Sequence, residues 1–343
     1  MAIRKSADSR PQILEVSPLA AIPGGEFQVH GKNFAGGGGP TVTIGATPAP
    51  LVVGSDSFLI VRVPEGAPSG EIVIGKNGDS SAAQSLQVGA RIADGLHPIA
   101  NPAVDRRGNV YATFSGTRGQ KTPVSVYQVD AVTGQSVPFV SDIMNASGLA
   151  MDQDDILYVS SRQDGTVYRV SEAGTTSVYV EGMGVATGIV FDADGNMYVG
   201  DRSGTIFKVS RQRQIYVFAT IEPSIAAYHL AWGPDGYLYV AGPTTSSFDT
   251  VQRISPAGQV EVYYRGLGRP QGLAFDTSGN VYVAASFRGR RGVVRITPER
   301  EATLFLSGPG IVGLAFSPGG DMIVATSSAL YRVDVGITGY RVA

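Results

Sequence analysis

A segment of about 40 residues recurs along residues 97–343, and this repeat limits what the chain can fold into. In the copy at residues 273–286, a short apolar strand ends in Asp, a Ser-Gly-Asn turn follows, and an alternating apolar strand comes next. Successive first strands end 47, 40, 41, 43 and 41 positions apart. The residues at these ends are Asp105, Asp152, Asp192, Gly233, Asp276 and Ser317. A period near 40 in a strand-rich chain is typical of a β-propeller with four strands in each blade, so the sequence predicts six blades.

Two segments can supply the strand that closes this ring of blades. Residues 339–343 can serve as the fourth strand of the sixth blade, which requires no exchange of strands. Residues 90–96 align with residues 262–267, an outer strand and its exit, so the segment at 88–93 can compete for the same position. We expect complete blades over residues 97–343, with residues 90–96 as a short ordered linker.

The first 89 residues have a different pattern. Residues 1–10 are polar and are expected to be disordered. Over residues 11–89, runs of four to eight residues alternate apolar and polar between Gly/Pro turns, and no period of 3.6 residues is present. This pattern indicates a small β-sandwich. The predicted fold is therefore all-β, with a small immunoglobulin-like β-sandwich followed by a six-bladed β-propeller of four-stranded blades.

Composition narrows the functional classes. Charged residues make up 16% of the chain, the formal net charge is −2, and there is no cysteine. Near-neutral charge argues against nucleic-acid binding, and the lack of cysteine excludes disulfides and cysteine-ligated metals. No stretch approaches the roughly 18 apolar residues of a membrane span, and no apolar run typical of a signal peptide follows the polar start. We expect a monomer in the cytoplasm, or a secreted protein if a leader was removed.

Two parts of the sequence resemble known families. The first is similar to the immunoglobulin-like IPT/TIG domains, which mostly act as spacers or interaction modules. Its matching marks are Ile13-x-x-Val-Ser-Pro18, Pro23-Gly-Gly25, Val29-x-Gly-x-Asn-Phe34, Val42-x-Ile-Gly45 and Val61-x-Val-Pro64. In the second part, copies such as residues 272–284 resemble NHL repeats and, equally, the six-bladed propellers of the gluconolactonase and senescence-marker-protein superfamily. This second resemblance implies the propeller fold and says little about function, because the shared residues are those that form blades.

The lactonase branch of that superfamily implies a divalent cation, calcium or zinc. Its ligands are a Glu that opens the first inner strand, an Asn in a Pro-Asn-Gly, and an Asp that ends a second strand. In this sequence the Glu has no counterpart, Gln271 stands in place of the Asn, and Asp201 ends a second strand. The resemblance therefore implies at most a degenerate metal site at Asp201 and Gln271, and no other cofactor is expected.

The polar residues that differ between copies gather at what we call the channel mouth. It is formed by the loops that enter inner strands and the loops that leave second strands. These residues are biased toward Arg, whose planar donors suit carboxylates, although exposed loop arginines can also serve only to solubilise the surface. The candidate ligand-binding residues are His97, Asn101, Asn145, Arg162, Asp201, Arg202, Tyr228, His229, Gln271 and Arg288.

Three functions follow as alternatives. The first is a binding or interaction protein whose polar, Arg-rich propeller face receives a small anionic or polyhydroxylated ligand or a protein partner. The second is a metal-dependent hydrolase of the lactonase type, and the third is a structural, surface-associated module. No Gly-x-Ser-x-Gly nucleophile motif is present, so Ser-His-Asp catalysis is not predicted and no catalytic residue is assigned.

Overall fold

The computed structural model describes residues 9–35, 39–117, 119–246 and 249–342. The predicted disorder at residues 1–10 falls almost wholly outside this part of the chain. All regular elements of the described residues are strands, which confirms the all-β class. The chain divides into two compact units, Met1–Ala90 with Leu304–Pro309, and Arg91–Thr303 with Gly310–Ala343.

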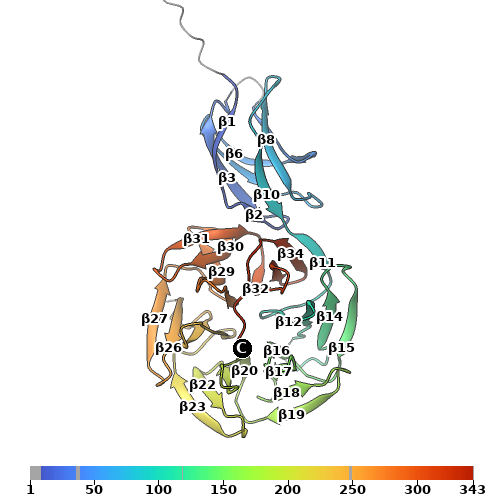
Figure 1. Ribbon diagram of the computed structural model, residues 1–343, viewed down its shortest axis with the longest axis vertical. Coiled ribbons are helices and arrows are strands. Elements are labelled where there is room, and N and C mark those ends of the chain that lie inside the picture. The colour runs from blue at the N-terminus through green and yellow to red at the C-terminus, as the bar shows by residue number, and fades with distance from the viewer. Residues whose placement is uncertain (1–8, 36–38, 118, 247–248, 343) are drawn as a thin grey trace, which may run out of the picture. The chain divides into compact units, whose positions relative to one another are not determined.

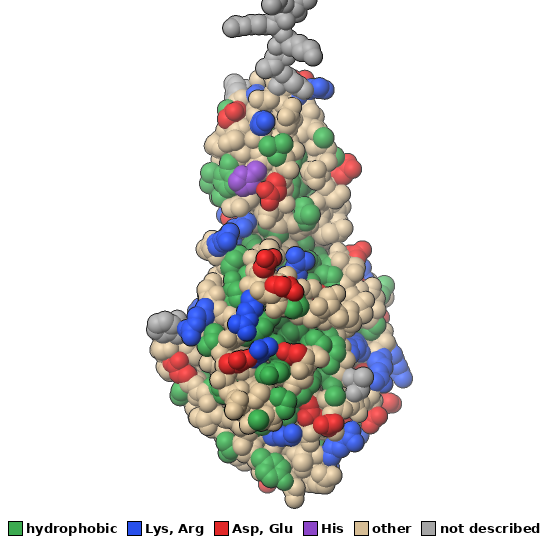
Figure 2. Space-filling model, turned by 60° about the vertical axis from the view of Figure 1, so that its left-hand side comes forward, with side chains coloured by type: hydrophobic (Ala, Val, Ile, Leu, Met, Phe, Trp, Pro, Cys, Tyr) green, Lys and Arg blue, Asp and Glu red, His purple; other side chains and the backbone are tan. Residues whose placement is uncertain are grey.

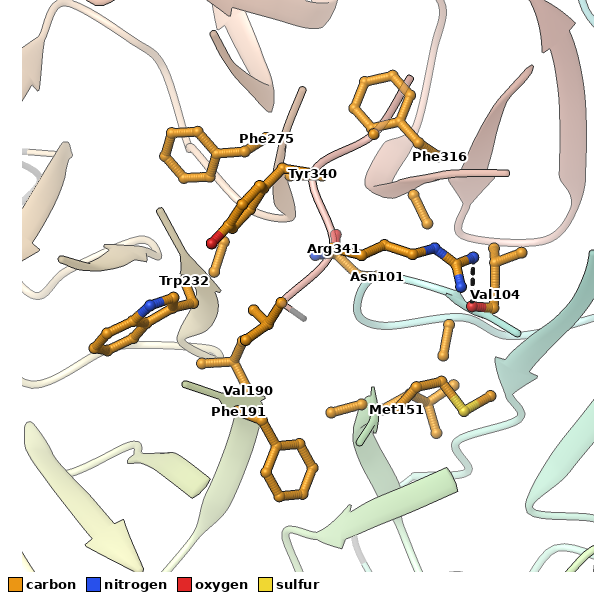
Figure 3. Close-up of a pocket in the computed structure, with 18 of the residues that line it drawn as sticks. Asn101, Val104, Met151, Val190, Phe191, Trp232, Phe275, Phe316, Tyr340 and Arg341 are labelled. Carbon is orange, nitrogen blue, oxygen red and sulfur yellow. Dashed lines mark hydrogen bonds between the residues drawn. The ribbon is translucent and has the colours of Figure 1, made fainter. Parts of the chain in front are cut away.

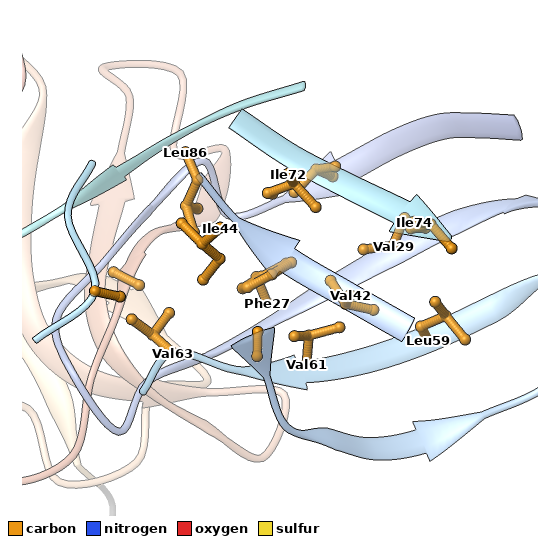
Figure 4. Close-up of a cluster of buried hydrophobic side chains, with 14 of the residues drawn as sticks. Phe27, Val29, Val42, Ile44, Leu59, Val61, Val63, Ile72, Ile74 and Leu86 are labelled. Atoms are coloured by element: carbon orange, nitrogen blue, oxygen red, sulfur yellow. The ribbon is translucent and has the colours of Figure 1, made fainter. Parts of the chain in front are cut away.

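The first unit contains the predicted β-sandwich. Its strands are β1 (Gln12–Ser17), β2 (Ala20–Ala21), β3 (Glu26–Lys32), β4 (Thr41–Ile44), β5 (Thr47–Ala49), β6 (Leu51–Gly54), β7 (Phe58–Arg62), β8 (Gly70–Lys76), β9 (Asp79–Ser80) and β10 (Gln84–Val88). One sheet has the order β1-β3-β7-β6, and the other has the order β2-β10-β8-β4-β5, with β9 paired to β8. Alternate residues of these strands point inward, so Phe27, Val29, Leu59 and Ile74 are fully buried in one apolar core (Figure 4).

The strands from Ala90 onward form the six-bladed propeller. Blade one has β12 (Ala103–Val104), β13 (Asn109–Thr113), β14 (Val126–Asp130) and β15 (Ser136–Val140); blade two has β16 (Ala146–Met151), β17 (Leu157–Ser161), β18 (Val167–Val170) and β19 (Thr176–Val180). Blade three has β20 (Ala186–Phe191), β21 (Met197–Asp201), β22 (Thr205–Val209) and β23 (Ile215–Thr220); blade four has β24 (His229–Trp232), β25 (Leu238–Ala241), β26 (Thr250–Ile254) and β27 (Val260–Arg265). Blade five has β28 (Leu273–Phe275), β29 (Val281–Phe287), β30 (Arg290–Ile296) and β31 (Ala302–Ser307); blade six has β32 (Ile311–Phe316), β33 (Asp321–Thr326) and β34 (Leu330–Asp334). Within each blade the strands pair in chain order, and the blades form a ring around a central channel (Figure 1).

One carboxylate closes the inner hairpin of a blade and also holds a tyrosine of the second strand. In blade five, Asp276 accepts hydrogen bonds from the backbone N–H of Asn280 (2.9 Å), from its Nδ2 (2.7 Å) and from the hydroxyl of Tyr282 (3.1 Å). The same arrangement recurs at Asp105 with Tyr111 and at Asp192 with Tyr198. Most of the Asp, Gly and Asn residues of the repeat therefore serve the turn.

The buried tyrosines then connect neighbouring blades. The ring of Tyr282 packs edge-on against Phe316 of the next blade, with 5.2 Å between centroids, and Tyr198 stacks on Trp232 at the same separation. Burial and the nearby Asp105 carboxylate raise the pKa of Tyr111 to about 12, so its hydroxyl stays protonated and donates at neutral pH. The turn and the blade interface are thus built from the same residues.

The ring closes differently from the expectation for the linker. The strand β11 (Ala90–Ala93) pairs with β34, so the sixth blade has the order β11-β34-β33-β32. Residues 90–93 are therefore the fourth strand of blade six, and the prediction that residues 90–96 form only a linker was wrong for this part. Pairing with β34 satisfies the backbone groups that an outer edge would otherwise leave open.

The C-terminal segment is consequently free of the sixth blade's edge and takes another path. Gly339 forms an isolated bridge with Asp276 of blade five, and the N–H of Tyr340 donates to the carbonyl of Phe275 (2.8 Å). Beyond these contacts, Arg341 Nη2 donates to the carbonyls of Val104 and Asp105 in blade one, each at 3.1 Å. The expectation that residues 339–343 form the fourth strand of blade six was thus wrong, and the competing segment at residues 88–93 supplies it instead. The last described residues lie near the centre of the ring (Figure 1).

The surface has mixed charge. On the face in Figure 2, basic and acidic side chains are interspersed with apolar ones, in keeping with the net charge of −2. No helix long and apolar enough to cross a membrane occurs in the part of the chain that the structure describes.

Candidate functional site

The channel narrows at one layer of the inner strands, four positions before the residues that end them. Glycine occupies this position in four copies, and Asn101 and His229 occupy it in the other two; we call these six residues the pinched layer (Asn101, Gly148, Gly188, His229, Gly272 and Gly313). Neighbouring strands approach so closely here that a Cβ on Gly188 would lie 2.5 Å from the carbonyl oxygen of Tyr228. The remaining space, about 20 Å³, suffices for one water molecule.

Asn101 fills the other half of this layer. Its Nδ2 donates to the carbonyl of Leu273 (2.9 Å), and its Oδ1 accepts from the N–H of Leu314 (3.1 Å). A Cβ on Gly272 would lie 2.0 Å from the Asn101 Oδ1, so glycine is required there. Asn101 thus holds blades one, five and six together, which explains its place in the channel without a ligand.

At the channel mouth, two predicted residues hold loops. Asn145 is buried with φ of 49°; its Oδ1 accepts from the N–H of Gly119 (2.9 Å), and its Nδ2 donates to the carbonyls of Gly116 (3.1 Å) and Thr117 (3.0 Å). Asp201 is also buried and accepts from the N–H of Val185 (2.8 Å) and from the hydroxyl of Ser203. Both side chains therefore have structural partners within the chain.

The arginines and His97 occupy the same end of the channel. Arg162 donates to Ser115 Oγ (3.2 Å) and to the carbonyl of Gly116 (3.1 Å). Arg202 is exposed and donates from Nε to the carbonyl of Ser224 (3.2 Å). His97 is exposed, with its Nδ1 at hydrogen-bond distance from the carbonyl of Ser115, and Arg288 is exposed with its guanidinium over the Phe287 ring.

Arg291, which was not among the candidate ligand-binding residues, is held at the mouth by hydrogen bonds to acceptors within the chain. It is half-buried, donates to the carbonyls of Arg269 (3.0 Å) and Ile311, and donates to the Oε1 of Gln271. Burial and the neighbouring Arg269 lower the pKa of Arg291 to about 10, so it remains charged at neutral pH. No carboxylate of the described residues forms an ion pair with it.

His229 of the pinched layer lies close enough to Arg291 to be affected by its charge, and Tyr228 precedes His229 in the chain. Burial, with a smaller effect of the Arg291 charge, lowers the pKa of His229 to about 4, so the imidazole is neutral at pH 7. The Tyr228 side chain packs in the core between blades three and four, and burial raises its pKa above the ordinary value. Its hydroxyl is buried and has no hydrogen-bond partner among the described residues.

These residues do not fit the divalent cation that the lactonase resemblance implies. The Oε1 of Gln271 accepts from a guanidinium, which would repel a metal ion, and both carboxylate oxygens of Asp201 already accept hydrogen bonds. Calcium requires six to eight oxygen ligands, usually with carboxylates. No group of three His, Asp or Glu side chains suited to a metal is present within the described residues.

A larger cavity lies at the opposite end of the channel, where the inner strands end; we call this the exit end. It has a volume of about 450 Å³. Its wall contains the residue two positions before each strand end, a set that we call the alanine ring: Ala103, Ala150, Val190, Ala231, Ala274 and Ala315. The C-terminal residues Tyr340, Arg341 and Val342 complete the lining (Figure 3).

Among the predicted site residues, two pairs are brought together, and the others are distributed around the mouth. Gln271 and His229 both lie near Arg291, and the backbone carbonyl of Asn145 accepts from the N–H of Arg162 (3.2 Å). Of the predicted ligand-binding residues, only Asn101 lines the exit-end cavity, so the prediction missed this site. Its signal in the sequence is Ala at the same position in five of the six copies, with Val190 in the other, together with the C-terminal segment left over once residues 90–93 complete the ring.

Comparison with known proteins supports the two-part fold. Residues 11–88 match the IPT/TIG domain, so the first unit contains an IPT/TIG domain as the resemblance implied. A search of curated protein sequences finds no match to this chain.

Solved structures match the fold over most of the chain. An auxiliary nutrient binding protein from Bacteroides thetaiotaomicron has a TM-score of 0.57 at 13% identity, with 95% of this chain and 98% of that chain covered. A similar protein from Bacteroides ovatus has a TM-score of 0.54 at 14% identity, covering 97% and 98%. A gluconolactonase from Xanthomonas campestris has a TM-score of 0.60 at 14% identity, covering 71% and 88%. Structures of this kind thus include both binding proteins and lactonases, and at these identities they establish the fold alone.

Proposed function

We propose that this chain is a binding protein that takes a small anionic ligand at the mouth of its propeller channel. The observation that supports this best is the half-buried Arg291 guanidinium, whose acceptors are neutral oxygens. A cation removed from water without a counter-charge costs several kcal/mol. A carboxylate or phosphate at this position would offset that cost.

Gln271 suggests how such an anion would be received. Its carboxamide oxygen is the side-chain acceptor of Arg291 Nη2, whereas the other acceptors are backbone carbonyls. A rotation of the half-buried Gln271 amide would free the guanidinium edge for two parallel hydrogen bonds to a carboxylate. The exposed Arg269 and Arg288 would add positive potential along the approach.

Binding is favoured over hydrolysis because the described residues of the mouth do not assemble a set of reactive groups. The predicted metal-binding residues do not fit a divalent cation, and His229 is buried at the pinched layer. A binding protein needs only a receptive surface. The neighbour described as nutrient binding supports this class of function, and a hydroxylated acid such as gluconate would use both the charge and the polar rim of the mouth.

The test is a calorimetric titration with gluconate, citrate, inorganic phosphate and a poly-glutamate peptide, the last standing in for an acidic segment of a protein partner. We expect at least one to bind, with affinity that falls as salt is raised. Arg291→Gln should weaken binding at least tenfold, because it removes the charge and keeps a polar side chain. Arg107→Gln is the matched control, since Arg107 is exposed and lies at the exit end.

Two outcomes would overturn the proposal. One is that none of the four anions binds the wild-type chain at millimolar concentration. The other is that Arg291→Gln, folded by circular dichroism, binds as tightly as the wild type. Equal weakening by Arg107→Gln would indicate a general charge effect and would count against the site at the mouth.

A further inference from the structure

The exit end of the channel carries a separate site. We infer that the cavity enclosed by the alanine ring and the C-terminal residues binds a small, uncharged, ring-containing molecule. The cavity of about 450 Å³ lies within the range of roughly 300–1,000 Å³ typical of small-molecule pockets. This inference does not depend on the anion site proposed at the mouth.

The cavity exists because the side chains that face the channel at this level are too small to fill it. Five of the six ring positions are Ala and the sixth is Val190, so the inner strands do not fill the channel at this level. The larger residues one position later, such as Phe191, Phe275 and Phe316, point outward and pack between blades (Figure 3). At the level of the alanine ring, the wall toward the channel is therefore formed by small apolar side chains.

The pinched layer closes the inner end of this cavity. Its glycines leave no room for side chains, and the space beside His229 holds no more than about one water molecule. A ligand at the exit end therefore cannot pass to the mouth. Water finds few hydrogen-bond partners between apolar side chains, so a cavity lined mainly by them favours apolar guests of matching size.

The C-terminal segment supplies the outer wall. Arg341 is held by the carbonyls of Val104 and Asp105, and the N–H of Tyr340 is held by Phe275, so the segment spans from blade five to blade one. This path brings the Tyr340 ring over the cavity (Figure 3). The Tyr340 ring offers a flat aromatic surface, which favours a ring-containing ligand over a branched chain.

The charged residues at the rim already have partners within the chain. Asp155 accepts from the N–H of Arg106 (2.7 Å), and Arg106 donates from Nη2 to the carbonyl of Gln153 (2.6 Å). Asp152 accepts from the N–H groups of Asp154 and Ile156, each at 2.9 Å. The charged groups at the rim therefore do not need a charged ligand as partner, in contrast to Arg291 at the mouth.

The chain contains a built-in reporter for the test. Trp232 is the single tryptophan; it borders the cavity, and its ring points outward and stacks on Tyr198 between blades three and four (Figure 3). The probe is N-phenyl-1-naphthylamine, which is uncharged and becomes fluorescent in apolar surroundings, so the arginines of the mouth do not attract it. We expect saturable binding at one site, with a matching change in Trp232 emission.

Substitutions in the alanine ring test whether the probe binds in this cavity. Ala274→Leu should fill the cavity and weaken probe binding at least tenfold, and Ala274→Val serves as a milder variant because the ring already accommodates Val190. Ala257→Leu is the matched control, since Ala257 is exposed in a turn of the same propeller. Tyr340→Ala should weaken binding by removing the aromatic wall.

The inference is overturned if the probe binds without saturation, or if folded Ala274→Leu and Ala274→Val both bind it as the wild type does. It is also overturned if Arg291→Gln weakens probe binding as much as Ala274→Leu, because the probe would then occupy the mouth. Failure of the anion titrations leaves these outcomes unchanged, so the two sites are tested separately.

Discussion

The two ends of the propeller channel are built on opposite principles. At the mouth, the six copies carry different residues, and many of these polar side chains bind one another or the loop backbone, as Asn145 and Asp201 do. At the exit end, the copies carry nearly the same small residue, and the space between them stays open. Where the copies differ, polar side chains fill the end of the channel with contacts. Where the copies share a small residue, a cavity remains.

This difference shows that a residue that differs between copies and a residue that the copies share can have different roles. A polar residue that departs from its counterparts can serve a loop, as the hydrogen bonds of Asn145 illustrate. A small residue shared by nearly all copies, as Ala is in five of the six, can create a site, because short side chains around one axis cannot meet. The two ends also differ in charge, since enclosed Arg291 lies near the mouth and apolar side chains dominate the exit end.

The largest expected effect tests the layer that separates the two ends. Gly188→Ala places a Cβ 2.5 Å from the Tyr228 carbonyl oxygen, so backbone must move, and we expect a loss of about 3 kcal/mol in the free energy of unfolding. Urea denaturation measures it. Gly319→Ala, whose added Cβ would find its nearest atoms at 3.7 Å, should be close to neutral. Equal stability of the two variants would show that the layer is not pinched.

The next effect concerns protonation below the mouth. His229 has a folded pKa of about 4 against 6.5 in the unfolded chain, so the unfolded state takes up the proton first as pH falls. Stability from this residue is complete above pH 6.5 and is lost toward pH 4, with about 2 kcal/mol lost between pH 7 and pH 5. His229→Gln should show a shallower loss over this interval in urea denaturation. Identical slopes would indicate that His229 is accessible to protons in the folded state.

A third effect sharpens the role of the mouth residues. Asp201→Ala leaves the N–H of Val185 without its acceptor, which should cost about 1.5 kcal/mol. Because both carboxylate oxygens have partners, we expect calcium, zinc and magnesium to leave the melting temperature of the wild type unchanged. A rise with one of these ions that disappears in Asp201→Ala would restore the metal site at the mouth.

The smallest effect compares copies at the exit end. In blade four, Gly233 replaces the usual Asp, and Asp235 binds the hydroxyl of Tyr239 instead (2.8 Å). Tyr282→Phe and Tyr239→Phe should each cost about 1 kcal/mol by removing one hydrogen bond to a carboxylate. A much smaller loss for Tyr239→Phe would mean that the substitute carboxylate of blade four is not equivalent.

The inner hairpins could be predicted because their interactions are local. Asp276 binds residues two to six positions later, so its role is written in a short stretch of sequence. The mouth was predicted as a face but not in its details, since Arg291 is one of several loop arginines until the fold brings Gln271 and Ile311 against it. The role of Asn101 was equally hidden, because its partners Leu273 and Leu314 lie 172 and 213 positions away.

The sequence by itself determined the β-sandwich, the six blades and the residues that form each turn, because these depend on alternation, spacing and turn chemistry within about 40 residues. Only the tertiary structure decided which segment completes the ring. Outer strands pair through backbone groups, so residues 90–93 and 339–343 were both acceptable by pattern, and the choice depended on which of them reaches the free edge of β34. That choice released the C-terminal segment to cross the exit end, and with it decided the outer wall of the cavity.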